Sequence, residues 1–142
     1  MTDTPRTDAL LVVEDDPDDL HFLLRALRKT GSALPVRVAR TGQAALDYLQ
    51  GAEGQADRLL AVLLDLKLPV RSGFEVLEHL KQSPELRATP VVILTSSGET
   101  RDLKRAYELG ANSYLVKPAQ AEALMELVRS IEAYWLRQNR VV

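Results

Sequence analysis

The apolar positions of this chain fall into short unbroken runs, separated by stretches in which apolar residues recur every three or four positions. The longest run, Leu59–Leu64, consists of six apolar residues and leads directly into Asp65. A run of this length without alternation indicates a strand buried on both faces, as in a parallel sheet. Further strands are predicted at Ala9–Val13, Pro90–Leu94 and Ser113–Val116, and the alternating stretch Pro35–Arg40 predicts an edge strand.

The stretches between the strands predict helices, because their apolar residues share one helix face. Pro17 and its neighbouring acids mark one helix start, Thr41 is a predicted N-cap, and Gly110 is a predicted C-cap. The predicted helices run from Pro17 to a stop at Gly31, from Thr41 to Leu49, from Ser72 to Gln82, from Thr100 to Leu109 and from Ala119 to Arg137. Gln50–Arg58, which contains two glycines, is predicted to be a loop.

Strand and helix therefore alternate five times along the chain. This order predicts a single α/β domain over residues 1–142 with a flavodoxin-like, doubly wound (βα)5 fold. Its five-stranded parallel sheet is expected in the order 2-1-3-4-5, with helices on both faces and right-handed crossovers. Residues 1–8 are expected to form a flexible polar arm and residues 138–142 a tail.

Composition narrows the class of protein. The net charge of -2 gives no global electrostatic attraction to nucleic acid or to an anionic membrane. The chain has no cysteine, which excludes disulfides, thiol catalysis and thiolate metal sites and suits a reducing cytoplasm. No apolar run nears the length of a membrane span, and the first residues are polar, so we expect a cytoplasmic protein without a signal peptide.

Polar side chains follow four of the predicted strands. They are Glu14, Asp15 and Asp16 after the first strand, Asp65 after the third, Thr95 and Ser96 after the fourth, and Lys117 after the fifth. The carboxyl ends of parallel strands meet at one edge of a sheet, where open α/β sheets bind their ligands. The sequence therefore predicts a site at this edge that combines acids, hydroxyls and an amine.

The residue types at this edge favour phosphoryl chemistry. Three carboxylates packed together repel one another, so a bound cation or raised pKa values must relieve them. Oxygen ligands without histidine or cysteine suit Mg²⁺, which also recruits phosphate oxygens. A carboxylate such as Asp65 can attack phosphorus and form an aspartyl phosphate, while Lys117 supplies a second positive charge.

Four segments resemble the receiver domain of two-component response regulators of the chemotaxis-regulator type. They are Leu11–Pro17, Asp65–Pro69 with Gly73 eight residues after the acid, Val92–Thr95, and Gly110–Ala111 followed by Tyr114–Pro118. Each is weak alone, but all four in this order are highly specific and span nearly the whole chain. The resemblance implies a stand-alone response regulator, without an output domain, that takes a phosphoryl group from a sensor histidine kinase. It would switch contacts with an unidentified downstream protein and dephosphorylate itself slowly, rather than act as an enzyme.

The resemblance also implies roles for the matching positions. These are Asp65 as phosphoacceptor, Glu14 and Asp15 with Asp65 and the Lys67 backbone carbonyl as Mg²⁺ ligands, Thr95 and Lys117 as partners of the phosphoryl oxygens, and Tyr114 as the rotating aromatic that reports the state of Thr95. Asp16 matches a third acid that the family does not require for the metal. The Lys117–Pro118 bond is expected to be cis, as it usually is in this family.

A narrower resemblance is to the phytochrome-associated receivers. It is based on Ile131–Leu136, the Leu68–Pro69 pair and the Gln50–Arg58 loop, and implies a bacterial phytochrome kinase as donor and a homodimer through the last helix region. This chain departs from that subgroup at Lys67, where Asn is more usual. Lys67 and Ser97 are therefore the positions expected to tune the lifetime of the phosphorylated state.

Plainer explanations exist for several of these residues. Acids such as Asp16, Asp18 and Asp19 suit a solvated helix start, and Thr95 alone would suit a cap. Tyr114 alone would suit a half-buried strand position, and His21 and His79 are expected to be ordinary surface residues. Trp135 is either an anchor for the last helix or an interface residue.

Two other functions suit the same fold. A phosphatase with an aspartyl intermediate often places a second acid two residues after the nucleophile, but this chain has Lys67 there. A flavin or dinucleotide module would carry a glycine-rich or hydroxyl-rich loop after its first strand, but the acids of Glu14–Pro17 would repel phosphate. Both features favour the receiver over these alternatives.

Overall fold

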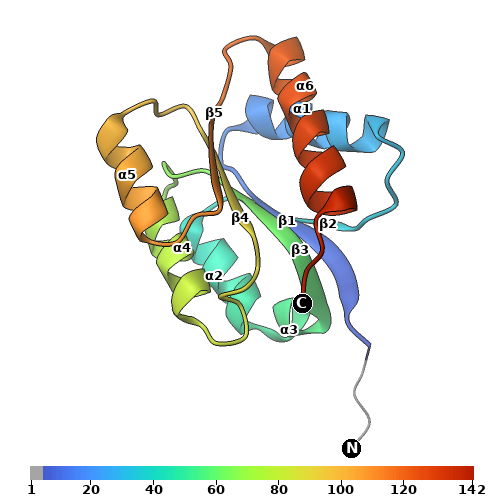
Figure 1. Ribbon diagram of the computed structural model, residues 1–142, viewed down its shortest axis with the longest axis vertical. Helices are drawn as coiled ribbons and strands as arrows, with labels where there is room; N and C mark the ends of the chain where they lie inside the picture. The colour runs from blue at the N-terminus through green and yellow to red at the C-terminus, as the bar shows by residue number, and fades with distance from the viewer. Residues whose placement is uncertain (1–4) are drawn as a thin grey trace, which may run out of the picture.

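Five parallel strands form the central sheet in the order β2-β1-β3-β4-β5, which confirms the predicted topology. The computed structural model describes residues 5–142 of the chain (Figure 1). The strands are β1 (Thr7–Val13), β2 (Val36–Ala39), β3 (Asp57–Leu64), β4 (Val91–Thr95) and β5 (Ser113–Val116). Every residue of β4 is buried and most of β1 and β3 is as well, as expected for strands covered on both faces.

Helices cover both faces of this sheet (Figure 1). They are α1 (Pro17–Lys29), α2 (Gly42–Gln50), α3 (Ala52–Ala56), α4 (Gly73–Gln82), α5 (Thr100–Glu108) and α6 (Ala121–Ile131), which continues as the π-helix η1 (Glu132–Gln138). Residues of α2, α4 and α5 pack in one apolar cluster on one face, and residues of α1 and α6 pack in a second cluster on the other face. The result is a three-layer sandwich with its two cores on either side of the sheet.

The structure corrects two expectations about local structure. The expected loop Gln50–Arg58 contains the short helix α3 and the first residues of β3. Gly54 permits this turn, because a Cβ there would lie 2.1 Å from the backbone oxygen of Tyr48. The Lys117–Pro118 bond is not cis, since the described residues contain no cis peptide bond; the trans form is the lower-energy one for a bond before proline.

The chain ends also differ from the expectation. Residues 1–4 of the expected arm lie outside the described residues, but Thr7 and Asp8 already belong to β1 and pair with Asp57 and Arg58 of β3. The last helix begins later than expected and changes to π-helical geometry at Glu132, whose buried carboxylate accepts a 2.6 Å hydrogen bond from Arg137. The strand ladder therefore reaches into the expected arm, and the last helical segment reaches Gln138, the first residue of the expected tail.

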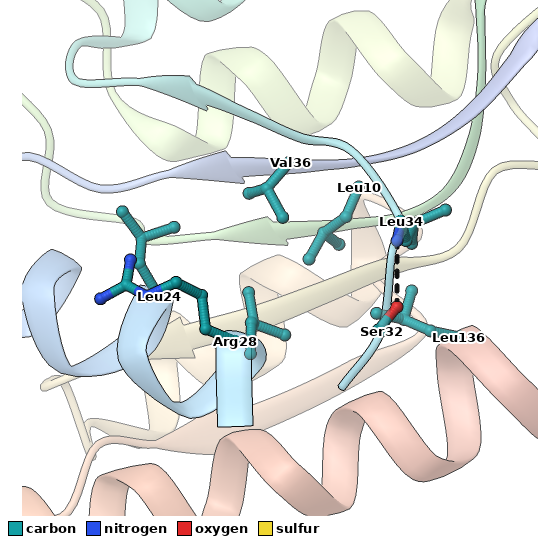
Figure 2. A pocket seen from close by; sticks show the side chains of 8 residues that line it. Leu10, Leu24, Arg28, Ser32, Leu34, Val36 and Leu136 are labelled. Atoms are coloured by element: carbon teal, nitrogen blue, oxygen red, sulfur yellow. Dashed lines mark hydrogen bonds between the residues drawn. The ribbon is translucent and has the colours of Figure 1, made fainter. Parts of the chain in front are cut away.

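The packing around α1 leaves one apolar hollow (Figure 2). It has a volume of about 170 Å³ and lies between α1, β2 and the C-terminal η1 segment. Its walls include Leu10, Leu24, Leu34, Val36 and Leu136. Ser32 lies at this hollow as well, but its hydroxyl accepts the backbone N–H of Leu34 at 3.2 Å and is therefore already used.

Candidate functional site

Backbone hydrogen bonds just beyond the strands carry the predicted site residues to the edge of the sheet. The N–H of Glu14 donates to Ala39 at 3.0 Å, and the N–H of Asp65 donates to Val13 at 3.1 Å. The N–H of Lys117 donates to the Thr95 carbonyl at 2.8 Å. The pairing pattern thus extends past the ends of the strands, which places these residues on a rigid frame rather than on free loops.

Lys117 lies at the centre of the carboxylates. Its Nζ atom is 2.6 Å from Glu14 Oε1, 2.8 Å from Asp65 Oδ2 and 3.0 Å from Asp19 Oδ2. The Lys117 and Asp65 side chains are each only 7% exposed, and that of Glu14 is 2% exposed. One buried ammonium therefore faces three carboxylates, which leaves an excess of negative charge.

Burial and charge shift the pKa values of two of these groups. Burial raises the pKa of Glu14 to about 7, and the charge of Asp65 acts in the same direction, against the hydrogen bond from Lys117. Burial would lower the pKa of Lys117, but its hydrogen bonds to Asp65 and Glu14 outweigh burial and raise it. The ammonium is therefore firmly protonated, and Glu14 is the carboxyl that most readily takes a proton, which relieves the excess of negative charge.

Three acids at this edge could hold a cation. Oxygen atoms of Glu14, Asp15 and Asp65 all lie within 4.8 Å of one another. Glu14 and Asp65 are buried, whereas Asp15 is exposed to solvent. Three carboxylate oxygens without histidine or cysteine fit a hard divalent ion such as Mg²⁺ or Mn²⁺.

The loop after Asp65 folds tightly against the strand end. The N–H of Lys67 donates to Asp65 Oδ1 at 3.2 Å, so this loop helps to orient the carboxylate. Gly73 is required at the start of α4, because a Cβ there would lie 2.1 Å from the backbone oxygen of Asp65. Val70 and Arg71 have φ angles of 45° and 74°, which are strained for residues with side chains.

Thr95, Ser97 and Tyr114 form a connected group beside the acids. Thr95 is fully buried, and its Oγ1 accepts the N–H of Ser97 at 3.5 Å. The hydroxyl of Tyr114 donates to the backbone oxygen of Ser97 at 2.9 Å, which turns the ring inward. Burial raises the pKa of this Tyr114 hydroxyl, so it stays a donor at neutral pH.

The structure separates the acids of the first helix, which sequence reasoning grouped together. Asp16 is the N-cap of α1, where its Oδ1 accepts the N–H groups of Asp18 and Asp19 at 2.9 Å. Asp18 is exposed, as expected for a solvated helix start. Asp19, however, joins the site through Lys117, a role that sequence reasoning missed.

The remaining candidates lie away from the acids. His21 is exposed and stacks edge-on with Phe22 at 5.4 Å between ring centroids, and His79 lies on α4. Trp135 is partly buried and packs on the cluster formed by α1 and α6, as an anchor would. Its neighbour Tyr134 is 51% exposed. The acids, Thr95 and Lys117 therefore make up the site without any histidine.

This fold and this acidic edge identify the class of protein. The chain belongs to the response regulator receiver domain family, whose family model matches residues 10–129. Within the described residues, no helix is long and apolar enough to span a membrane.

The individual relatives include phytochrome response regulators. The chain is 46% identical over 132 residues to the probable methanogenesis regulatory protein FilR2 of Methanothrix harundinacea, covering 92% of this chain and 85% of that protein. It is 37% identical over 129 residues to the response regulator Rcp1 of Synechocystis, covering 89% of this chain and 88% of Rcp1. The Mn²⁺-bound structure of Rcp1 matches with a TM-score of 0.87, 35% identity and coverage of 94% of this chain and 98% of Rcp1. The phosphorylated cyanobacterial phytochrome response regulator RcpA matches with a TM-score of 0.88, 33% identity and coverage of 96% and 98%.

Proposed function

We propose that this protein is a response regulator that accepts a phosphoryl group on Asp65 from a sensor histidine kinase, in a Mg²⁺-dependent reaction. The observation that carries this proposal is the position of Asp65. Its buried carboxylate lies 2.8 Å from the Lys117 ammonium and within 4.8 Å of the Glu14 and Asp15 carboxylates. A nucleophile, a cation and a set of metal ligands therefore meet at one point.

The proposed reaction is a direct displacement at phosphorus. A carboxylate oxygen of Asp65 forms the new P–O bond while the P–N bond of a phosphohistidine donor breaks, and the imidazole leaves with a proton from solvent. Lys117 and Thr95 would bind the transferred oxygens, as the resemblance to the family implies, and Glu14, Asp15, Asp65 and the Lys67 carbonyl would hold Mg²⁺. When bound, Mg²⁺ neutralises charge on the acids and on the phosphoryl group. Attack of water on the acyl phosphate later restores Asp65 and releases inorganic phosphate.

Intact-mass spectrometry after incubation with acetyl phosphate and Mg²⁺ tests this proposal. We expect wild-type protein to gain the mass of one phosphoryl group and to gain none when EDTA removes the metal. Asp65→Asn should gain none, because an amide is not a nucleophile towards phosphorus. Asp18→Asn is the matched control, since Asp18 is an exposed acid outside the ion-pair network, and it should behave as wild type. An adduct that survives Asp65→Asn would remove the assignment of the phosphoacceptor.

We further propose a bacterial phytochrome kinase as the donor. The similarity to RcpA and Rcp1 supports this choice, together with the sequence features of the last helix. Phosphotransfer profiling with purified histidine kinases, phytochromes included, tests it. Faster transfer from a phytochrome kinase than from the others is expected, and failure of every phytochrome kinase would remove this donor while leaving the phosphoacceptor proposal intact.

The proposed output is a change in protein contacts, including a homodimer through the last helix region. Tyr134 supports this choice of surface, since it is exposed and stacks edge-on with the anchored Trp135 at 4.9 Å. Sedimentation velocity should detect a dimer of the wild-type protein and a weaker one for Tyr134→Ser. A monomer at every concentration, with or without acetyl phosphate, would contradict the dimer.

A further inference from the structure

We propose that Asp102 is a positioning residue that ties the loop after β4 to helix α5, so that movement of Thr95 on phosphorylation is transmitted to α5. This inference rests on the proposed function of Asp65. It concerns a residue outside the acidic site, which neither binds the metal nor contacts the phosphoacceptor. The structural basis is a chain of hydrogen bonds through Ser97.

Ser97 connects three parts of the molecule. Its N–H donates to Thr95 Oγ1 at 3.5 Å, its carbonyl accepts the Tyr114 hydroxyl at 2.9 Å, and its own hydroxyl donates to Asp102 Oδ2 at 2.6 Å. The same hydroxyl accepts the N–H of Glu99 at 3.3 Å. Ser97 is only 4% exposed, and every polar group that it carries is engaged. A displacement of this residue must therefore shift its partners or break these bonds.

The hydrogen bond from Ser97 to Asp102 connects the loop after β4 to helix α5. Asp102 lies in the first turn of α5, and the N-cap residue Glu99 makes no side-chain capping bond. The start of the helix is instead fastened to Ser97, through the Glu99 N–H and the Asp102 carboxylate. A hydroxyl bonded to a carboxylate at 2.6 Å is a short charge-assisted bond and the shortest of the four at Ser97.

Phosphorylation of Asp65 would act on the Ser97–Asp102 hydrogen bond through Thr95. When the Thr95 hydroxyl turns to a phosphoryl oxygen, its long contact with the Ser97 N–H must adjust. Ser97 then moves with α5 if Asp102 holds it, or without α5 if the carboxylate is absent. The Glu99 N–H also holds Ser97, but at the longer distance of 3.3 Å, so Asp102 supplies the larger part of the coupling between Asp65 and the exposed side chains of α5, including Leu103 and Tyr107.

Hydrogen exchange measured by mass spectrometry tests this role on the full chain. Peptides that cover residues 96–109 are compared before and after incubation with acetyl phosphate and Mg²⁺, with phosphoryl occupancy measured on the same samples. We expect phosphorylation to change exchange in α5 of the wild-type protein, and Asp102→Ala to reduce that change by about twofold or more at equal occupancy. Asp102→Asn should fall between the two, because its amide oxygen still accepts the Ser97 hydroxyl proton. Glu122→Ala, which removes an acid from the first turn of α6, is the matched control and should respond as wild type.

The possible results separate the role of Asp102 from the proposed function of Asp65. An Asp102→Ala protein whose α5 responds as fully as wild type would overturn the role of Asp102, and so would a phosphorylated wild type whose α5 does not change. If Asp102→Ala does not fold, Asp102→Asn carries the same comparison, and an undiminished response in it would overturn the role. Absence of a phosphoryl group on every variant, wild type included, would instead contradict the proposed function, and the inference would fall with it.

Discussion

At the scale of single residues, the energetics depend on how far each ion pair is shielded from water. Two arginine–aspartate pairs at the amino-terminal edge of the sheet show the contrast. Arg37 holds Asp57 with bonds of 2.9 and 3.1 Å, and the Asp57 side chain is only 3% exposed. Arg58 holds Asp8 with bonds of 2.7 and 3.0 Å, but both side chains are more than two-fifths exposed, at 43% and 44%.

These two pairs predict different responses to mutation. Asp57→Asn should lower the free energy of unfolding by about 2 kcal/mol, because it leaves a buried site without its charge-assisted bonds to Arg37 and Tyr48. Asp8→Asn, the matched control, should cost about 0–1 kcal/mol because water screens the exposed pair. Urea unfolding at neutral pH measures both values. Equal losses would contradict this view of the Asp57 pair.

The buried pair also predicts a dependence on pH. The hydrogen bond from Arg37, with help from Tyr48, outweighs burial and holds the pKa of Asp57 below its usual value. A group with a lowered pKa contributes stability above its unfolded pKa of about 4, and this contribution disappears as the pH falls through the folded pKa. Wild-type protein should therefore lose more stability than Asp57→Asn between neutral pH and about pH 3. Urea unfolding of both proteins at the two pH values measures the two losses of stability. Equal losses in wild type and Asp57→Asn would contradict a lowered pKa of Asp57.

At the scale of elements, the strands and long helices follow from the sequence, and the short or irregular segments do not. Apolar runs and helical periodicity predicted all five strands and the five main helices, because these elements turn their apolar residues towards the sheet or its covering helices. The helix α3 has no such face, since none of its residues is buried. The left-handed conformations of Val70 and Arg71 carry no local signal, because valine disfavours that region. Such segments are determined by contacts distant in sequence, which a pattern of apolar residues does not record.

The apolar hollow beside α1 makes a prediction about packing at this scale. Val36 lies in its wall, so Val36→Ile adds a methylene to empty space of about 170 Å³. We expect this change to raise the free energy of unfolding by about 0.5–1 kcal/mol, as cavity-filling changes commonly do. Val12→Ile is the matched control on the adjacent strand, where the side chain is fully buried, and it should cost about 1–3 kcal/mol through overpacking. Urea unfolding measures the change in the free energy of unfolding, which should be positive for Val36→Ile and negative for Val12→Ile. A loss of stability in both variants would show that the hollow cannot accept a larger side chain.

At the scale of the whole molecule, the parallel topology explains how much of the site was predictable. Glu14, Asp65, Thr95 and Lys117 each end or follow a strand, so the order of strands alone brings them to one edge. Asp19 and Asp102 were not predictable as partners, because their roles depend on side-chain directions from helices on opposite faces. The sheet therefore sets which groups meet, and the helices set how they are connected to the rest of the molecule.

The carboxylates outnumber the ammonium at the carboxyl edge of the sheet, and this excess of negative charge predicts that a divalent cation stabilises the fold. Binding of a divalent ion to the native state alone should raise stability in proportion to the logarithm of its concentration. Thermal unfolding of the wild-type protein should shift upward with added Mg²⁺, and Asp15→Asn should weaken that shift because it removes the exposed acid of the cluster. Asp18→Asn, an exposed acid outside the cluster, should keep the wild-type shift. Equal shifts in both variants would place Asp15 outside the metal site.

The most direct measurement of the central claim is chemical trapping of the phosphorylated residue. Borohydride reduces an acyl phosphate to an alcohol, which converts aspartyl phosphate into homoserine. After incubation with acetyl phosphate and Mg²⁺, followed by reduction and digestion, peptide sequencing should find homoserine at position 65, the position of Asp65. Homoserine at position 15 instead, or no homoserine at all in a protein that carries a phosphoryl group, would contradict the account.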